Sequence, residues 1–252
     1  MLPTLITIAE TAGEQIMAVY QDPQLFAQLD HKSDQSPLTL ADRRAHTCIA
    51  DALAKHFPDI PLLSEEGKHT PYATRKDWTR FWLVDPLDGT KEFVQRNGDF
   101  TVNIALIDKG KPILGVIVAP AYGHTYTGIV GQGATRKSGT QSHPIQVRHR
   151  TRDWVALVSR AHASPEEQVF LADYPVTETQ AVGSSLKFCR IAEGAADCYL
   201  RTGPTMEWDT AAGQAILEAA GGTITQIDGS PMTYNKENLR NPAFWCLGGK
   251  TL

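Results

Sequence analysis

Apolar residues recur at helical spacing near the start of the chain, at Leu5, Ile8, Ala12, Ile16 and Val19. Residues with this period line one face of a helix, so the pattern predicts an amphipathic helix over residues 2–20. A second helix is predicted over about 39–57, because Pro37 suits a helix start and Pro58 cannot continue a helix.

The apolar runs that follow are short and rich in β-branched and aromatic residues. Turn signals such as Asp108-Lys109-Gly110 and Gly131-Gln132-Gly133 separate them. These runs predict strands at 61–63, 79–84, 101–107, 113–118 and 124–130.

The segment 131–144 is rich in Gly, Ser, Thr and His and is the best candidate for an internal boundary. It divides the chain into halves of residues 1–140 and 141–252. Beyond it, predicted strands alternate with helices, which indicates a layered α/β architecture. The expected strands are 154–158, 176–181 and 197–201, and the expected helices follow Pro165, cover 185–194, and cover 208–219 with an end at Gly221-Gly222.

Composition narrows the classes of function. A net charge of -4 and a pI near 6.1 argue against a nucleic-acid backbone as the main partner, because phosphate neutralisation needs clustered Lys and Arg. The cysteines form no CxxC pair and no zinc-finger spacing, so all are expected to be reduced. The chain has neither a bilayer-length apolar run nor a signal-peptide pattern. The sequence therefore predicts a cytoplasmic protein and leaves peripheral contact with the inner membrane open.

Two aspartates stand in an unusual place in FWLVDPLDGTKEF, residues 81–93. Asp85 directly follows a run that looks buried, and Asp88 comes three residues later. A buried carboxylate is costly unless it is paired or binds a metal. The alternative is an ordinary turn, which accounts for Pro86 and Gly89 but not for the position of Asp85.

Three other segments also place acids at the ends of predicted elements. Each has a simpler interpretation, as a solvated loop, a helix-dipole contact or an Asx turn. Together they favour a hard cation such as Mg²⁺, which prefers carboxylate and carbonyl oxygens. The turn could add the Leu87 carbonyl, and the backbone after Gly89 could approach a phosphate oxygen. The three segments are PLLSEE with Glu65 and Glu66, EWDTAAG with Asp209, and KSDQSPLTLAD with Asp34 and Asp42.

The segment GSSLK, residues 183–187, has two interpretations. A predicted helix start followed one turn later by Lys187 can bind an anion. Alternatively, Ser184 or Ser185 caps the helix and the lysine is solvated. His162 is equally open, since it could be a pocket residue or a surface loop residue.

These motifs, taken in chain order, resemble the inositol monophosphatase superfamily of Mg²⁺-dependent, lithium-sensitive phosphatases over essentially the whole chain. Three stretches are similar to the 3'(2'),5'-bisphosphate nucleotidases of the CysQ type: KSDQSPLTLAD, LVSRAH and VGSSLKFCRIAEGAADCYLRTGPTMEWDTAAG. The resemblance implies an α/β fold, an αβαβα sandwich, with the active site between its two halves.

The resemblance also implies roles for individual residues. Asp42 and Thr90 would orient or deprotonate the attacking water, with Glu65 also taking part in catalysis. Ala161 departs from the family pattern, which has serine there. Two or three Mg²⁺ ions would be held by Glu65, Asp85, the Leu87 carbonyl, Asp88 and Asp209. The substrate would be contacted by Gly89, Thr90, Ser159, His162, Ser184, Lys187 and Asp209.

The activity implied is removal of the 3'-phosphate from adenosine 3',5'-bisphosphate to give AMP. A sulfonucleotide with the same 3'-phosphate would be a second substrate, and Li⁺ would inhibit. Inositol monophosphatase or fructose-1,6-bisphosphatase activity on the same fold is the alternative, although GSSLKFC stands where an inositol enzyme would have a GTAAVN-like stretch. A non-catalytic binding protein is a further alternative, disfavoured by the complete acid set with Thr90 and Asp42. The sequence leaves a homodimer open.

Overall fold

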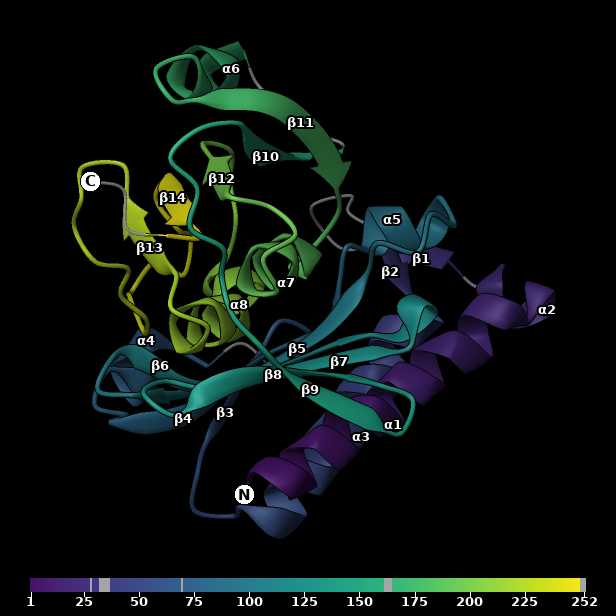
Figure 1. The fold of residues 1–252 in the computed structure, drawn as a ribbon. Helices are drawn as coiled ribbons and strands as arrows, with labels where there is room; N and C mark the ends of the chain where they lie inside the picture. Colours follow the sequence, from purple (N-terminus) through teal and green to yellow (C-terminus); the bar gives the residue numbers. More distant parts are fainter. Residues whose placement is uncertain (28, 32–36, 69, 161–164, 250–252) are drawn as a thin grey trace.

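The computed structural model describes all residues except 28, 32–36, 69, 161–164 and 250–252. The predicted site residue His162, the acid Asp34 and the departure at Ala161 therefore lie outside the described residues. Five layers follow one another in space, in the order helices, sheet, helices, sheet, helix (Figure 1). This arrangement confirms the predicted αβαβα sandwich.

The first helical layer consists of α1 (Leu2–Gln21) and α3 (Leu40–His56), which pack against each other and against one face of the first sheet. The apolar stripe predicted from the sequence is the buried face of α1. It shares a core with the sheet residues Trp82, Val84 and Ile104. Burial of this stripe therefore fixes α1 and α3 on the outer face of the sheet.

The first sheet has seven strands in the order β3-β4-β5-β6-β7-β8-β9. β3 and β4 are parallel, and the other neighbours are antiparallel. The strands are β3 (Leu62–Ser64), β4 (Arg80–Asp88), β5 (Thr101–Asp108), β6 (Lys111–Ala119), β7 (His124–Ile129), β8 (Gly133–Ser138) and β9 (Gln141–Ile145).

The segment 131–144, expected to be a boundary, carries the hairpin of β8 and β9 and belongs to this sheet. Its glycines and polar residues suit an exposed edge hairpin, and its apolar positions are too few to give a clear strand signal. The chain leaves the first sheet after Ile145. The division into two halves near residue 140 stays a prediction.

The second sheet is mixed and has the order β11-β10-β12-β14-β13. β10 is parallel to β11 and β12, while β14 is antiparallel to β12 and β13. The strands are β10 (Trp154–Ser159), β11 (Val176–Val182), β12 (Cys198–Arg201), β13 (Thr223–Gln226) and β14 (Phe244–Leu247).

Two helices, α7 (Leu186–Ala192) and α8 (Glu207–Ala219), fill the space between the sheets. The α6 helix (Pro165–Leu171) covers the outer face of the second sheet. Two glycines let α8 approach the first sheet closely. A Cβ on Gly115 would lie 2.4 Å from the Ala212 carbonyl oxygen, and one on Gly128 would lie 2.6 Å from the Ile216 Cα. The position of α8, and of the acid at its start, depends on this close contact.

The remaining elements are short. No helix in the described part of the chain is long and apolar enough to cross a membrane. The short elements are α2 (Pro23–Phe26), β1 (Leu29–His31), β2 (Pro37–Thr39), α4 (Tyr72–Arg75), α5 (Thr90–Val94) and the 3₁₀ turn η1 (Pro120–Tyr122).

Candidate active site

The two aspartates of the DPLDG segment belong to strand β4, which continues beyond its predicted end at residue 84. Asp85 pairs with Asn103 of β5, and Asp88 pairs with Thr101, so the two residues between the aspartates face a single residue of β5. This irregularity in register disturbs the alternation of side chains along the strand. It explains how two acids three positions apart bring their carboxylates together, which an ordinary turn after the strand would not.

A triplet of carboxylates forms where β4 meets the start of α8. Asp85, Asp88 and Asp209 bring ligand oxygens within 4.8 Å of one another. Asp85 is only 2% exposed, and burial, followed by the charges of Glu65 and Asp88, raises its pKa well above the usual range. Burial and then Asp88 likewise raise the pKa of Asp209. Like charges this close, with oxygen ligands only, fit a hard divalent cation such as Mg²⁺.

Asp88 is held by Asn103, which had no predicted role, and by Ser185, which was predicted only as a possible helix cap. Its Oδ2 accepts the Ser185 N–H at 2.6 Å and the Asn103 amide at 3.2 Å, and the Ser185 hydroxyl also donates to it. The Ser185 Oγ lies 2.7 Å from the Asp209 carbonyl oxygen. Ser185 therefore connects two of the three acids. The available sequence signal was a polar Asn103 inside the apolar run TVNIALI.

The start of α7 also bears on the two interpretations of GSSLK. The side chain of Ser185, the N-terminal capping position, makes no cap hydrogen bond in α7. Ser184 is the serine that accepts a backbone N–H, from Leu186 at 3.3 Å. Ser184 precedes the capping position, so its bond to Leu186 belongs to a local turn, and neither serine makes the predicted side-chain cap of α7.

Asp42 and Thr90 meet beside the carboxylates, as the resemblance implied. The Thr90 hydroxyl lies 3.4 Å from Asp42 Oδ1 and 3.4 Å from the Leu87 carbonyl oxygen, and it can donate to one of them at a time. Asp42 is in the first turn of α3 and is buried. Glu65 follows β3 and donates its N–H to the Val84 carbonyl.

Two glycines bring the halves of the molecule into close contact. Gly89 has φ +88°, a left-handed conformation that glycine adopts without a steric penalty. A Cβ there would lie 3.0 Å from the Asp99 carbonyl oxygen and 3.1 Å from the Ser184 Cβ. A Cβ on Gly183 would lie 2.5 Å from the Glu92 Cγ. The wall between the acids and the second half therefore leaves no room for larger residues.

A cavity of about 270 Å³ is lined by residues at the ends of strands of both sheets and at the starts of α5, α7 and α8. Its acids are Glu65, Asp88, Glu92 and Asp209, and burial raises the pKa of Glu92. Phe188, Tyr199 and Phe244 give it aromatic walls, and its cations are Lys91, Arg160, Lys187 and Arg201.

The residues predicted to contact the substrate that line this cavity are Gly89, Thr90, Ser159, Ser184, Lys187 and Asp209. The Ser159 hydroxyl accepts from Arg201 Nη1 at 2.9 Å. The Lys187 ammonium donates to the carbonyl oxygens of Val182 at 3.1 Å and Ser184 at 2.8 Å. Lys187 is only 5% exposed, and burial lowers its pKa to about 8. It is therefore not the solvated lysine of the alternative interpretation.

Arg160, Tyr199 and Arg201 line the cavity in addition to the predicted residues. Arg201 donates to the Pro204 carbonyl at 3.4 Å, and the Lys187 ammonium lies 5.0 Å from the centroid of the Tyr199 ring. Arg201 in CYLRTG could have been noticed in the sequence, because an arginine at the end of an apolar strand is seldom buried unless it has a partner.

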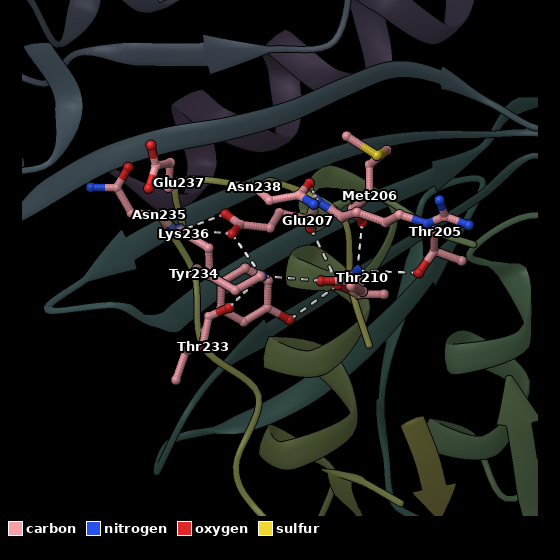
Figure 2. A network of polar contacts seen from close by, with 12 residues as sticks. Thr205, Met206, Glu207, Thr210, Thr233, Tyr234, Asn235, Lys236, Glu237 and Asn238 are labelled. Atoms are coloured by element: carbon pink, nitrogen blue, oxygen red, sulfur yellow. Dashed lines mark hydrogen bonds and ion pairs between the residues drawn. The ribbon is translucent and has the colours of Figure 1, made fainter. Parts of the chain in front are cut away.

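A second polar network holds the segment that carries Asp209 (Figure 2). Glu207 is fully buried, and its carboxylate accepts the backbone N–H groups of Asn235 at 2.7 Å and Lys236 at 2.9 Å. The Lys236 ammonium donates to the same carboxylate at 2.7 Å. Arg75, from α4 in the first half, donates to the Asn235 side chain and the Lys236 carbonyl. The network thus links the start of α8 to the first half of the molecule.

The model of the inositol monophosphatase family matches residues 1–248, and the chain belongs to this family. A protein of Escherichia coli (strain K12) named 3'(2'),5'-bisphosphate nucleotidase CysQ is 46% identical over 245 residues, 97% of this chain and 98% of its own length. A protein of Salmonella typhimurium with the same name is 45% identical over 247 residues, again 97% and 98%.

The crystal structure of CysQ from Bacteroides thetaiotaomicron matches with a TM-score of 0.88 and 42% identity, covering 98% of this chain and 97% of that one. These comparisons confirm the predicted family and its layered architecture. The roles of the individual site residues stay predictions.

Proposed function

We propose that this chain is a Mg²⁺-dependent phosphomonoesterase that removes the 3'-phosphate from adenosine 3',5'-bisphosphate and leaves AMP. A sulfonucleotide with the same 3'-phosphate is its second proposed substrate, so the enzyme would clear a by-product of sulfate activation. The observation that carries the proposal is a cavity in which Asp88 and Asp209 of the acidic triplet meet basic groups. The names of the relatives support the choice of nucleotide.

The donor set fits two or three Mg²⁺ ions, because every proposed ligand is an oxygen and the carboxylates repel one another without a cation. When bound, Mg²⁺ supplies charge neutralisation and acidifies the attacking water. Li⁺ is proposed to inhibit by competing for one of these positions. The proposed ligands are Glu65, Asp85, the Leu87 carbonyl, Asp88 and Asp209.

Thr90 and Asp42 would orient the water and receive its proton. When the Thr90 hydroxyl donates to Asp42, its lone pairs are left to accept from a water molecule. Asp42 is buried, so this interaction is little screened by solvent. The backbone N–H groups of Gly89 and Thr90 would hold the scissile phosphate while the leaving oxygen departs.

A phosphate-release assay with Mg²⁺ tests the proposal. We expect kcat/KM for adenosine 3',5'-bisphosphate to exceed that for inositol 1-phosphate, and removal of Mg²⁺ with a chelator to abolish turnover. A higher kcat/KM for the inositol phosphate would identify it, rather than the nucleotide, as the preferred substrate. Absence of turnover for both, with Mg²⁺ present, would contradict a phosphatase.

A further inference from the structure

Three of the four cations that line the cavity belong to the second half of the chain. Arg160 follows β10, Lys187 lies at the start of α7, and Arg201 ends β12. The fourth, Lys91, directly follows Thr90 in the first half. A substrate with two phosphates needs a second anion site. The acidic triplet repels anions and would hold a phosphate only through bound cations, so the other phosphate needs positively charged side chains elsewhere. The three cations of the second half are the candidates for that site.

Two of these cations are buried and already donate hydrogen bonds within the protein. Lys187 is nearly buried and gives two hydrogen bonds to backbone carbonyls. Arg201 is also buried and donates to Ser159 and to the Pro204 carbonyl. Both side chains line the cavity, but their burial leaves little room for them to turn toward a ligand.

Arg160 is arranged differently. Its side chain is 44% exposed, and its Nε and Nη2 both donate to Asp99 Oδ2, at 3.2 and 2.8 Å. Among the residues that the structure describes, Nη1 has no hydrogen-bond partner. One edge of the guanidinium is therefore held by protein, while the side chain also lines the cavity. A planar guanidinium oriented in this way suits a phosphate, which it can meet with two parallel N–H groups.

Asp99 is a fixed anchor for this arginine. It is only 3% exposed, and it accepts the Tyr122 hydroxyl at 2.6 Å and the Gly183 N–H at 2.9 Å as well as the arginine. The carboxylate is shared among donors from three segments of the chain, so Arg160 does not have to satisfy it alone. Such a held arginine loses little conformational entropy when a ligand arrives.

We propose that Arg160, oriented by Asp99, is a specificity-determining residue that binds the phosphate of the nucleotide that is not hydrolysed. The inference rests on the proposed function and adds a residue to it. It makes Arg160 the main direct contact of that phosphate, with Lys187 and Arg201 acting more through their charge.

The test compares adenosine 3',5'-bisphosphate with adenosine 3'-monophosphate, which lacks only the second phosphate. For Arg160→Ala we expect KM for the bisphosphate to rise about tenfold, which corresponds to about 1.4 kcal/mol, with kcat little changed. Kinetics with the monophosphate should stay as in the wild type. Arg152→Ala is the matched control, because the Arg152 side chain is 87% exposed and does not line the cavity. Arg152→Ala should change neither kcat nor KM for either nucleotide.

If Arg160→Ala does not fold, Arg160→Gln tests the same inference, since glutamine can still donate to Asp99 but carries no charge. The same selective rise in KM is expected for it, together with a rise of similar size in the inhibition constant of the product AMP and no change for inorganic phosphate. Equal losses on both nucleotides, or no loss on either, would overturn the inference. Failure of the wild type to hydrolyse either nucleotide would instead contradict the proposed function, and the inference would fall with it.

Discussion

The acidic side of the cavity brings Asp85, Asp88 and Asp209 within 4.8 Å of one another, whereas the basic side pairs its cations with protein oxygens. On the acidic side, burial and mutual repulsion raise the pKa of Asp85 well above its usual range. On the basic side, Arg160 has Asp99 as its partner, which keeps the guanidinium in one orientation.

The two sides of the cavity therefore depend on the ligand in different ways. The acids accept hydrogen bonds from the protein, but their mutual repulsion is relieved only when cations bind, so their geometry serves the chemical step. The cations are held before any ligand arrives, so they serve affinity and choice of substrate. Changes on the acidic side should therefore lower kcat, and changes on the basic side should mainly raise KM.

The largest effect is expected from Asp209→Asn or Asp88→Asn. Either change removes a charge from the triplet, and kcat should fall by about a hundredfold or more, which is about 2.7 kcal/mol of transition-state stabilisation. Phosphate release measures it, and circular dichroism should show a folded protein. Asp153→Asn, at an exposed side chain, is the matched control and should keep full activity. Retention of more than about a tenth of the wild-type kcat, a loss below about 1.4 kcal/mol, would refute the ligand assignment.

Lithium tests the acidic side without mutation. Li⁺ should inhibit uncompetitively with respect to the nucleotide, as expected if it competes for one of the proposed Mg²⁺ positions while the product is bound. The measurement is a series of initial rates at several Li⁺ and nucleotide concentrations. Insensitivity to Li⁺, with Na⁺ as the control for ionic strength, would indicate a different metal arrangement.

A smaller effect is expected from Lys187 on the basic side. Lys187→Met keeps the apolar stem but removes the charge, and KM for the bisphosphate should rise about three- to tenfold, less than for Arg160→Ala. The pKa of Lys187 is lowered to about 8 by burial, so the wild-type lysine loses its charge as the pH rises through that value. KM should therefore rise above pH 8 in the wild type and less in the methionine variant. A larger loss for Lys187→Met than for Arg160→Ala would reverse the assignment of the second phosphate.

The smallest effect concerns stability without metal. Because the pKa of Asp85 is raised in the folded state, its favourable contribution is complete below its unfolded pKa near 3.8 and is lost as the pH rises through the folded value. In a chelator, the melting temperature should thus decrease as the pH rises above about 4, by about 2–4 °C for each 1 kcal/mol lost. The decrease should be weaker for Asp85→Asn and for the wild type with Mg²⁺. Equal pH profiles for Asp85→Asn and the wild type in chelator would count against the repulsion described for the acidic side.

Local patterns in the sequence determined the elements whose burial is regular. The stripe from Leu5 to Val19 predicted a helix that the structure shows as Leu2–Gln21, and Gly221, with φ +93°, follows Ala220, the C-terminal cap of α8. The acids that the fold brings together could also be identified from the sequence. A carboxylate next to a buried run is costly in free energy in any fold unless it is paired or binds a metal. These features depend on neighbours within a few positions, so they can be recognised without a fold.

Only the tertiary structure decided which residues support the acids and which orient the cations. Asn103 and Ser185 are 82 positions apart, and Asp99 and Arg160 are 61 apart, yet each pair is within hydrogen-bond distance. The hairpin within 131–144 likewise became visible only through its pairing with β7. Such contacts depend on how two sheets and the helices between them pack, and single-residue preferences carry no information about partners so distant in the chain.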